Sequence, residues 1–252
     1  MENNYIRIAF FVEGLTETIF IRSLLLNIFD SSKLEIMFVR LLNSSRGAPT
    51  YSMPNPTAII KFLLIDVEGD SNVLSGIKER EKDFFSKGYK KIIGLRDMYS
   101  DEYKRTSKKR EIDDRIVSLI ISKAQGEIDK MNNPKLIKLH FATMEIEAWF
   151  IAMVDVLNKI DIRLTHSFIK RKLSFDILII DPQLFFRKPS NDLAKIYLLV
   201  GKTYQKTKKS LESLMSKMQK EDFYNLYNSG KVSNYKIFFE DVTEGFENYL
   251  TP

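Results

Sequence analysis

The feature that constrains this chain most is a strand-like apolar run that ends in a single acid. Residues 5–12 have the length and residue types of a strand that is covered on both faces. Glu13 and Gly14 follow, and Thr16 with Glu17 can begin a helix. In an open α/β sheet, ligands bind beyond the carboxyl ends of the strands. We therefore expect Glu13 to stand at a functional edge, with the rest of the chain supplying its partners.

Strand-like and helix-like segments alternate along the first two thirds of the chain. Further apolar runs of strand length cover residues 34–42, 59–66, 90–95 and 135–142. Segments with helical spacing of apolar residues cover 17–29, 72–86, 111–131 and a stretch that begins at 144. This alternation predicts an α/β fold with a mostly parallel sheet flanked by helices.

The character of the chain changes after about residue 160. Residues 161–190 read as irregular, and helices are predicted over 190–200, 205–220 and 221–228. Between residues 187 and 220 there are nine Lys or Arg and two acidic residues. We expect a core domain at 1–160 and a basic, mainly helical extension at 161–252 that packs on it. These basic helices are either a face that follows a nucleic-acid backbone or structural helices held by their leucines.

Composition excludes several kinds of chemistry. The 252 residues include no cysteine, which removes disulfides, thiolate zinc sites and cysteine nucleophiles. Of the two histidines, His140 lies in an apolar run and reads as a buried strand histidine rather than a catalytic one. Whatever chemistry the chain performs is therefore expected to use carboxylates.

The net charge of +6 favours an anionic partner, nucleic acid above all, although lysines also serve solubility. The N-terminal residues lack the basic and apolar segments of a leader, and no uninterrupted apolar run reaches 18 residues. We expect a cytoplasmic protein with no membrane contact.

Acidic residues follow the strands in a repeated pattern. Three predicted strands end in acid and a fourth is followed by two more; the residues are Glu13, Asp66 with Glu68, Asp97, and then Glu145 and Glu147. Parallel strands end at one edge of a sheet, so these carboxylates can converge. Carboxylate ligands without Cys or His favour Mg²⁺ or Mn²⁺. The alternative is that each acid only caps the helix that follows it.

Basic residues cluster beside the third of these acids. We expect contacts with nucleic-acid phosphates from Arg96, Lys104, Arg105, Lys108, Lys109, Arg110 and, further along, Lys206. The alternative for the cluster at 104–110 is a solvated loop.

Three motifs together resemble the signatures of Toprim-fold proteins. They are the segments 12–17 (VEGLTE), 94–99 (GLRDMY) and 144–150 (MEIEAWF). The group that these motifs resemble is an uncharacterised bacterial one related to the Toprim nuclease domains of OLD-type proteins. C-terminal segments around Lys188, residues 204–206 and residues 235–239 are also similar to that group. The resemblance implies a Toprim-like sheet, divalent-metal binding and phosphodiester chemistry on nucleic acid.

The resemblance also implies roles for individual residues. Glu13 matches the glutamate of the first Toprim strand, which in nucleases binds metal and assists as a general acid or base. Asp97 matches the first aspartate of an Asp-x-Asp pair, but Tyr99 stands where the second is expected. Asp101 or Glu102 can replace that second aspartate. Glu145 and Glu147 match the acids before the Trp-containing helix, and because they are two residues apart we favour Glu147 as the ligand.

We therefore expect a Mg²⁺- or Mn²⁺-dependent nuclease that cleaves DNA or RNA, with Glu13, Asp97 and Glu147 as catalytic residues. Groups of this kind are often encoded beside an ATPase in phage-defence loci, so the resemblance implies an ATPase partner and a defence role. Oligomer formation is compatible with this role. The alternative is a non-catalytic Toprim-like scaffold or sensor that binds an ATPase or a phage component.

Overall fold

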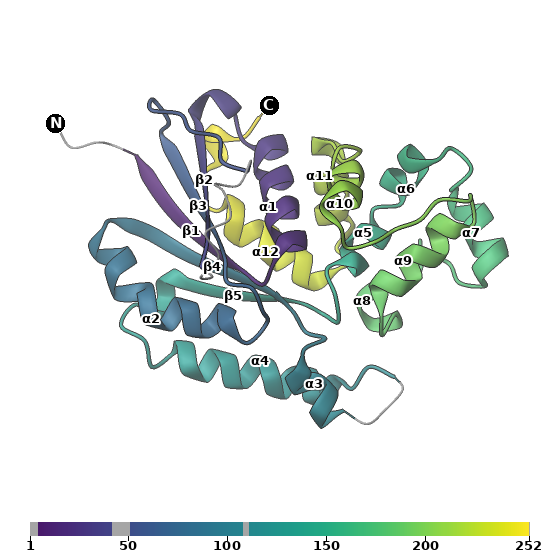
Figure 1. The fold of residues 1–252 in the computed structure, drawn as a ribbon, viewed down its shortest axis with the longest axis horizontal. Coiled ribbons are helices and arrows are strands. Elements are labelled where there is room, and N and C mark those ends of the chain that lie inside the picture. Colours follow the sequence, from purple (N-terminus) through teal and green to yellow (C-terminus); the bar gives the residue numbers. More distant parts are fainter. Residues whose placement is uncertain (1–4, 42–50, 108–110, 252) are drawn as a thin grey trace. The chain divides into compact units, whose positions relative to one another are not determined.

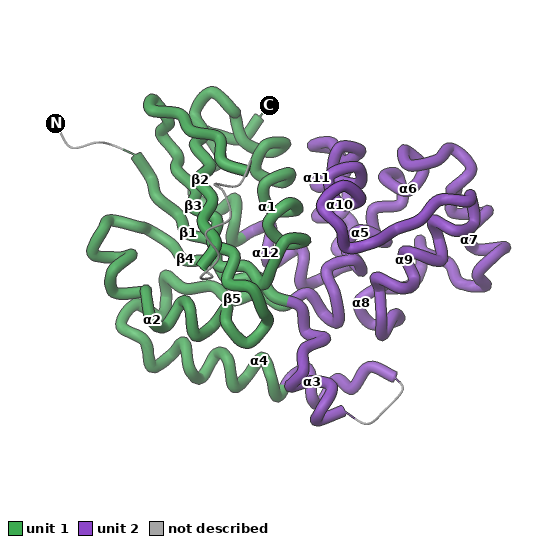
Figure 2. Tube along the Cα trace, viewed as in Figure 1, with its two compact units in different colours: residues 1–96, 119–141, 241–252 green, residues 97–118, 142–240 purple. Residues whose placement is uncertain are grey.

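The computed structural model describes residues 5–41, 51–107 and 111–251. The chain forms two compact units, coloured separately in Figure 2. We call residues 1–96, 119–141 and 241–252 the sheet unit, and residues 97–118 and 142–240 the helical unit. This division does not follow the expected boundary at residue 160, because the chain leaves the sheet unit after Arg96 and returns to it twice.

A five-stranded parallel sheet forms the centre of the sheet unit, which confirms the predicted fold class. Its order is β2-β3-β1-β4-β5. The strands are β1 (Ile6–Val12), β2 (Leu34–Arg40), β3 (Ile60–Asp66), β4 (Tyr89–Asp97) and β5 (Ile137–Ala142). In the middle of the sheet Val12 is level with Asp66 of β3 and Leu95 of β4. The carboxyl ends of these three strands therefore lie level with one another at one edge of the sheet. The prediction that the acids at these ends converge depends on this arrangement.

Helices cover both faces of this sheet (Figure 1). They are α1 (Leu15–Ile28), α2 (Asn72–Ser86) and most of α4 (Asp114–Ile128), with the short 3₁₀ turns η1 (Ser31–Lys33), η2 (Pro134–Leu136) and η3 (Glu247–Tyr249) in the connections. Alternate residues of β1 point to opposite faces. Phe11 packs in one core with Ile77 of α2 and Ile128 of α4. Phe10 packs against Phe62 on the other face.

The first helix begins earlier than the sequence predicts. Gly14 is the N-cap and α1 begins at Leu15 rather than Glu17. Gly14 has extended backbone with φ −176°, which any residue can adopt, so the turn does not require glycine. Thr18 donates a hydrogen bond from Oγ1 to the carbonyl of Gly14 at 2.8 Å. That contact satisfies a carbonyl at the helix entrance.

The helical unit contains short helices joined by tight turns. They are α3 (Asp101–Thr106), α5 (Glu147–Ala152), α6 (Val154–Ile160), α7 (His166–Leu173), α8 (Pro182–Phe185), α9 (Pro189–Leu198), α10 (Lys208–Met215), α11 (Lys220–Ser229) and most of α12 (Ser233–Thr243). Helix α7 lies in the segment 161–190 that the sequence suggested was irregular. Its N-cap Thr165 accepts a hydrogen bond from the N–H of Phe168. This is a capping signal that the surrounding prolines and charges obscured.

Among the described residues, no helix has both the length and the apolar character needed to cross a membrane.

Candidate metal centre

Three of the predicted acids come together in the helical unit. Asp97, Glu145 and Glu147 each place a carboxylate oxygen within 4.8 Å of the others. Asp97 and Glu147 are buried and Glu145 is partly buried. The convergence that the strand-end pattern predicts therefore occurs for these three residues.

The backbone fixes the first of these acids next to the turn that carries the other two. Asp97 is the last residue of β4. Beyond it, the N–H of Met98 donates to the carbonyl of Ala142 at 2.9 Å, and the N–H of Tyr99 donates to Met144 at 2.7 Å. The chain after β4 is thus held along the chain after β5.

The turn at Met144 has an unusual conformation. Met144 is fully buried and has φ +66°, in the left-handed region that bulky residues rarely adopt. Two residues later, the N–H of Ile146 donates to Oδ1 of Asp97 at 2.8 Å. Strained backbone of this kind is retained where the surrounding structure requires a particular placement. Here it places Glu145 and Glu147 beside Asp97.

Helix α5 carries the second glutamate into the interior. Glu147 is its first residue, and Ile146, Ala148 and Trp149 around it are fully buried. Nε1 of Trp149 donates to Oε1 of Gln183 at 2.6 Å. Trp149 is therefore a core residue, and its packing holds α5 in place.

Glu147 is fully buried, and its two carboxylate oxygens have different contacts. The hydroxyl of Tyr204 donates to Oε1 at 2.8 Å. Oε2 has no hydrogen-bond partner among the described residues, although Nζ of Lys206 lies 3.1 Å away. We take this contact as an ion pair whose geometry falls outside hydrogen-bond limits. Burial raises the pKa of Glu147, and the positive charge of Lys206 only partly opposes that shift.

Lys206 lies among all three carboxylates. Its Nζ is 3.8 Å from Asp97, 3.4 Å from Glu145 and 3.1 Å from Glu147. Burial alone would lower the pKa of Lys206, but the three acids outweigh it and raise the pKa above its usual value. The sequence assigned Lys206 to nucleic-acid binding, and no spacing rule linked it to acids about 60 residues earlier.

Glu145 connects this cluster to helix α9. The N–H of Ser190, in the first turn of α9, donates to Oε2 of Glu145 at 2.8 Å. Beside this turn is a pocket of about 400 Å³, lined by Tyr99, Arg187, Lys188, Asn191, Asp192 and Lys195. Nε of Arg187 is buried and has no hydrogen-bond partner among the described residues. No local sequence pattern indicates this basic pocket, because its members come from two distant segments.

Glu13 belongs to the sheet unit. Its N–H donates to the carbonyl of Leu95 at 3.3 Å, and its carbonyl accepts from the N–H of Gly69 at 2.8 Å. These bonds hold its backbone across the ends of β1 and β4. Its role as metal ligand and catalytic residue stays a prediction.

Asp101 is not a member of the acidic group. It begins α3, its side chain is exposed, and Oδ1 lies 3.3 Å from Nζ of Lys104. Arg105 donates from Nε to the backbone carbonyl of Asp101. The roles of Asp101 as a ligand and of Lys104 and Arg105 as phosphate contacts stay predictions. Lys108, Lys109 and Arg110 lie outside the described residues.

Several other charged residues near the strand ends have internal contacts. Arg96 is buried, faces the ring of Phe141 and lies 3.8 Å from Asp70. Asp66 and Glu68 both pair with Arg40, at 3.1 Å each. These contacts give the acids of β3 a structural function, and the nucleic-acid contact of Arg96 stays a prediction.

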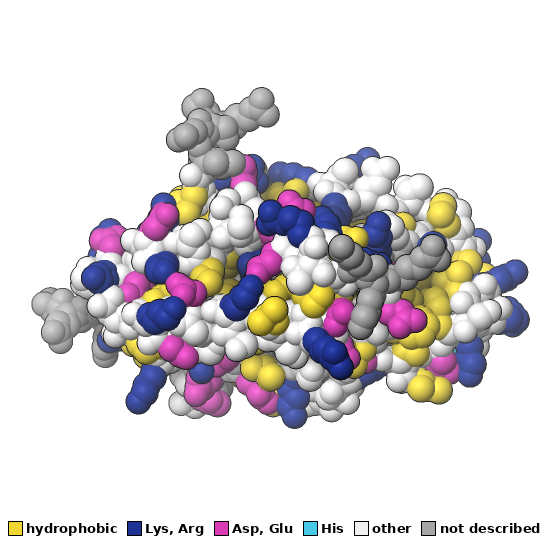
Figure 3. Space-filling view, turned by 90° about the horizontal axis from the view of Figure 1, so that it is seen from below, with side chains coloured by type: hydrophobic (Ala, Val, Ile, Leu, Met, Phe, Trp, Pro, Cys, Tyr) yellow, Lys and Arg dark blue, Asp and Glu magenta, His cyan; other side chains and the backbone are white. Residues whose placement is uncertain are grey.

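The surface does not gather its basic residues on one broad face in the view of Figure 3. There, Lys and Arg side chains are interspersed with Asp and Glu side chains.

Comparison of the chain with protein-family models, with characterised proteins and with solved structures finds no match. The resemblance to Toprim proteins accordingly rests on the three motifs of the sequence.

Proposed function

We propose that this chain is a divalent-metal-dependent phosphodiesterase that cleaves nucleic acid, with Asp97, Glu145 and Glu147 as its metal-binding carboxylates. The observation that carries the proposal is their convergence within 4.8 Å of one another around a buried oxygen of Glu147 that has no hydrogen-bond partner among the described residues. A structural acid at such depth ordinarily has its oxygens satisfied. Oε2 of Glu147 instead has only the ion pair with Lys206 among the described residues, and a divalent cation can supply the further contact that it lacks.

The donor set fits Mg²⁺ or Mn²⁺. All three groups are carboxylates, which are hard oxygen ligands. Lys206 can balance one of the three negative charges, so the cluster keeps a negative charge that favours a further cation. Such an ion, when bound, polarises a phosphoryl oxygen and activates water. The chain itself would position this ion. The hydroxyl of Tyr204 orients Glu147, and the N–H of Ile146 orients Asp97, each through a hydrogen bond.

The pocket next to Glu145 supports a phosphate-bearing substrate. Arg187, Lys188 and Lys195 line it, and Asp192 already pairs with Lys195 at 2.6 Å. A phosphate can accept hydrogen bonds from the free Nε of Arg187, since a guanidinium suits phosphate geometry. Tyr99, the residue that departs from the Asp-x-Asp pattern, lines this pocket and can contact a sugar or base.

Cleavage assays with purified protein test the proposal. Labelled single-stranded and duplex DNA and RNA should be cut with Mg²⁺ or Mn²⁺ and left intact with a chelator. Asp97→Asn and Glu147→Gln should each lower the cleavage rate at least a hundredfold. Asp155→Asn, an exposed acid on α6, is the matched control and should cleave as the wild type does. Equal cleavage by Glu147→Gln would contradict the proposal.

One observation favours a second candidate, the non-catalytic scaffold. Lys206 already forms ion pairs with all three acids, so the cluster is also consistent with a purely structural function. Divalent metal should then leave the melting temperature of the protein unchanged, whereas a metal centre predicts a rise. An ATPase partner, a role in phage defence and a cytoplasmic location remain proposals that rest on the resemblance and the sequence.

A further inference from the structure

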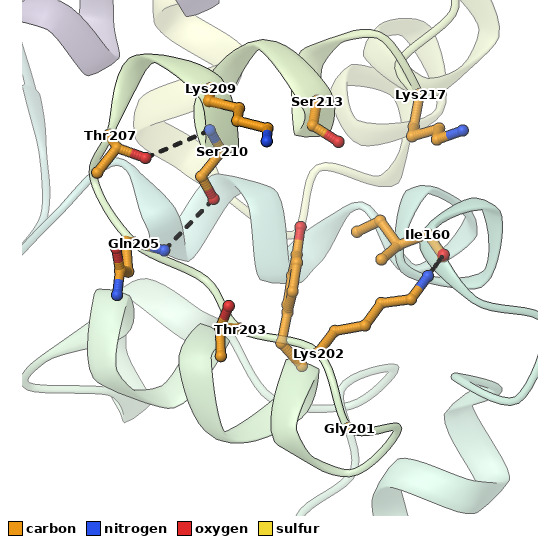
Figure 4. A pocket seen from close by; sticks show the side chains of 11 residues that line it. Ile160, Gly201, Lys202, Thr203, Gln205, Thr207, Lys209, Ser210, Ser213 and Lys217 are labelled. Carbon is orange, nitrogen blue, oxygen red and sulfur yellow. Dashed lines mark hydrogen bonds between the residues drawn. The ribbon is translucent and has the colours of Figure 1, made fainter.

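A second pocket in the helical unit has the lining of an anion site. It measures about 690 Å³, which is within the range of sites for nucleotide-sized ligands. Its lining residues are Ile160, Tyr197, Gly201, Lys202, Thr203, Gln205, Thr207, Lys209, Ser210, Ser213 and Lys217. Figure 4 shows Lys209, Ser213 and Lys217 along one side and Lys202 and Thr203 along the other.

The charged side chains that line this pocket are all positive. Three lysines, four Ser or Thr hydroxyl groups and Tyr197 line the pocket, and no acidic side chain does so among the described residues. Lys202 is engaged, because its Nζ donates to the carbonyl of Ile160 at 2.5 Å and lies 3.6 Å from Asp161. Lys209 and Lys217 are exposed lysines on the α10 side. Ammonium and hydroxyl donors around an open space match the oxygens of a phosphate.

The geometry of the hydroxyl groups is set by the entrance to α10. Oγ1 of Thr207, the N-cap, accepts from the N–H of Ser210 at 3.4 Å. Oγ of Ser210 accepts from the N–H of Gln205 at 3.3 Å. Both hydroxyl oxygens accept a hydrogen bond within the protein, and each O–H group can still rotate to donate to a ligand.

The extended segment 203–206 links this pocket to the acidic cluster. Thr203 and Gln205 line the pocket. Tyr204 and Lys206, between and after them, contact Glu147 and its neighbouring acids. The segment therefore presents alternate side chains to two sites, as extended backbone does.

We propose that this pocket binds a phosphate-bearing ligand through Lys209, Lys217 and the Ser and Thr hydroxyl groups that line it. Ile160 and Tyr197 give it an apolar wall for a sugar or base. The ligand is either a free nucleotide or one nucleotide of a single strand, since both carry the same chemistry. Binding does not depend on the metal centre. If the proposed function holds, the ligand contacts the segment that carries Lys206.

Calorimetric titration of the full chain in the presence of a chelator tests this proposal. The probes are inorganic phosphate, ATP and an unlabelled DNA pentamer. At least one probe should bind at millimolar concentration or below, and Lys209→Ala/Lys217→Ala should weaken it at least tenfold. Lys172→Ala, an exposed lysine in the last turn of α7, is the matched control and should bind as the wild type does.

The choice of probes distinguishes a free nucleotide from a nucleotide within a strand. Binding of ATP without the pentamer indicates a free nucleotide, whereas tighter pentamer binding that weakens with salt indicates a strand. Amide exchange should then slow in residues 201–217 of the bound protein. Absence of binding by every probe, or equal binding by the double variant, would overturn the proposal. Because no metal is present, this result does not depend on whether the chain cleaves nucleic acid.

Discussion

The ammonium of Lys206 lies 3.1 Å from Oε2 of Glu147, and that carboxylate is completely buried. The same ammonium is also within 4 Å of Asp97 and Glu145. The lysine thus balances part of the negative charge of the three acids in the metal-free protein. Replacing Lys206 therefore tests two things separately: how much the fold depends on a positive charge beside the three acids, and whether the acids bind a metal ion.

Lys206→Met is expected to destabilise the metal-free protein by about 1–3 kcal/mol, because it leaves carboxylates that were paired. The loss is smaller than for a fully buried pair, since the lysine side chain is 39% exposed. Added Mg²⁺ should recover most of the loss. Urea unfolding with Mg²⁺ and with chelator measures both effects, and Lys172→Met is the control. A loss of stability that metal does not reduce would indicate that the acids bind no ion.

Tyr204→Phe removes the hydroxyl that donates to Oε1 of Glu147. The expected cost is about 1–2 kcal/mol, because a buried carboxylate oxygen loses its donor. Tyr197→Phe is a matched control, since the rings of Tyr197 and Tyr204 pack 5.6 Å apart but the hydroxyl of Tyr197 does not contact the acids. Chemical unfolding of both variants should show the larger loss for Tyr204→Phe. Equal losses would mean that the bond to Glu147 contributes little.

Gly94 is required by packing in the sheet unit. A methyl group added there would lie 2.6 Å from Cδ1 of Leu139 and 3.0 Å from Ile77. Gly94→Ala should therefore cost about 1–3 kcal/mol. Leu139→Ala in the same chain should recover part of that cost, as a double-mutant cycle measures. Gly126→Ala in α4 meets no atom within 4 Å and should be neutral or stabilising by up to about 1 kcal/mol.

Asp241 is expected to make the stability of the sheet unit fall at acidic pH. Burial alone favours its neutral form, but contact with His140 at 3.2 Å and the charge of Lys138 lower the pKa of Asp241 below its usual value. A lowered pKa stabilises the folded state above the unfolded value, about 3.9, and this stability is lost as the pH falls through the folded value. Asp241→Asn should flatten the pH dependence of unfolding below about pH 4. An unchanged profile would contradict this assignment.

The sequence predicted the sheet well, because strand patterns are local. The apolar runs gave all five strands to within two residues at each end. Of the predicted acids, Asp97, Glu145 and Glu147 converge. Helix α7 and helix α12 were not predicted, although Thr165 is an N-cap signal for α7. The position of Lys206 could not be predicted either, since it depends on the fold of a segment about 60 residues after Glu147.

Tyr99 stands where the resemblance to Toprim proteins predicts a second aspartate. It lines the pocket with Arg187, and Nζ of Lys188 lies 5.9 Å from the centre of its ring. Glu145, Glu147 and Asp97 form a three-carboxylate group without that residue. The catalytic role predicted for Glu13 is tested by a Glu13→Gln variant in the cleavage assay.

The most direct test of the metal centre is a calorimetric titration of the purified protein with Mn²⁺. Wild type should bind Mn²⁺ at micromolar to millimolar concentration, and Glu147→Gln should bind at least tenfold more weakly. Asp155→Asn should match the wild type. Circular dichroism of each variant confirms that the fold is intact. Absence of Mn²⁺ binding by the wild type, or equal binding by a folded Glu147→Gln variant, would contradict a metal centre at these three carboxylates.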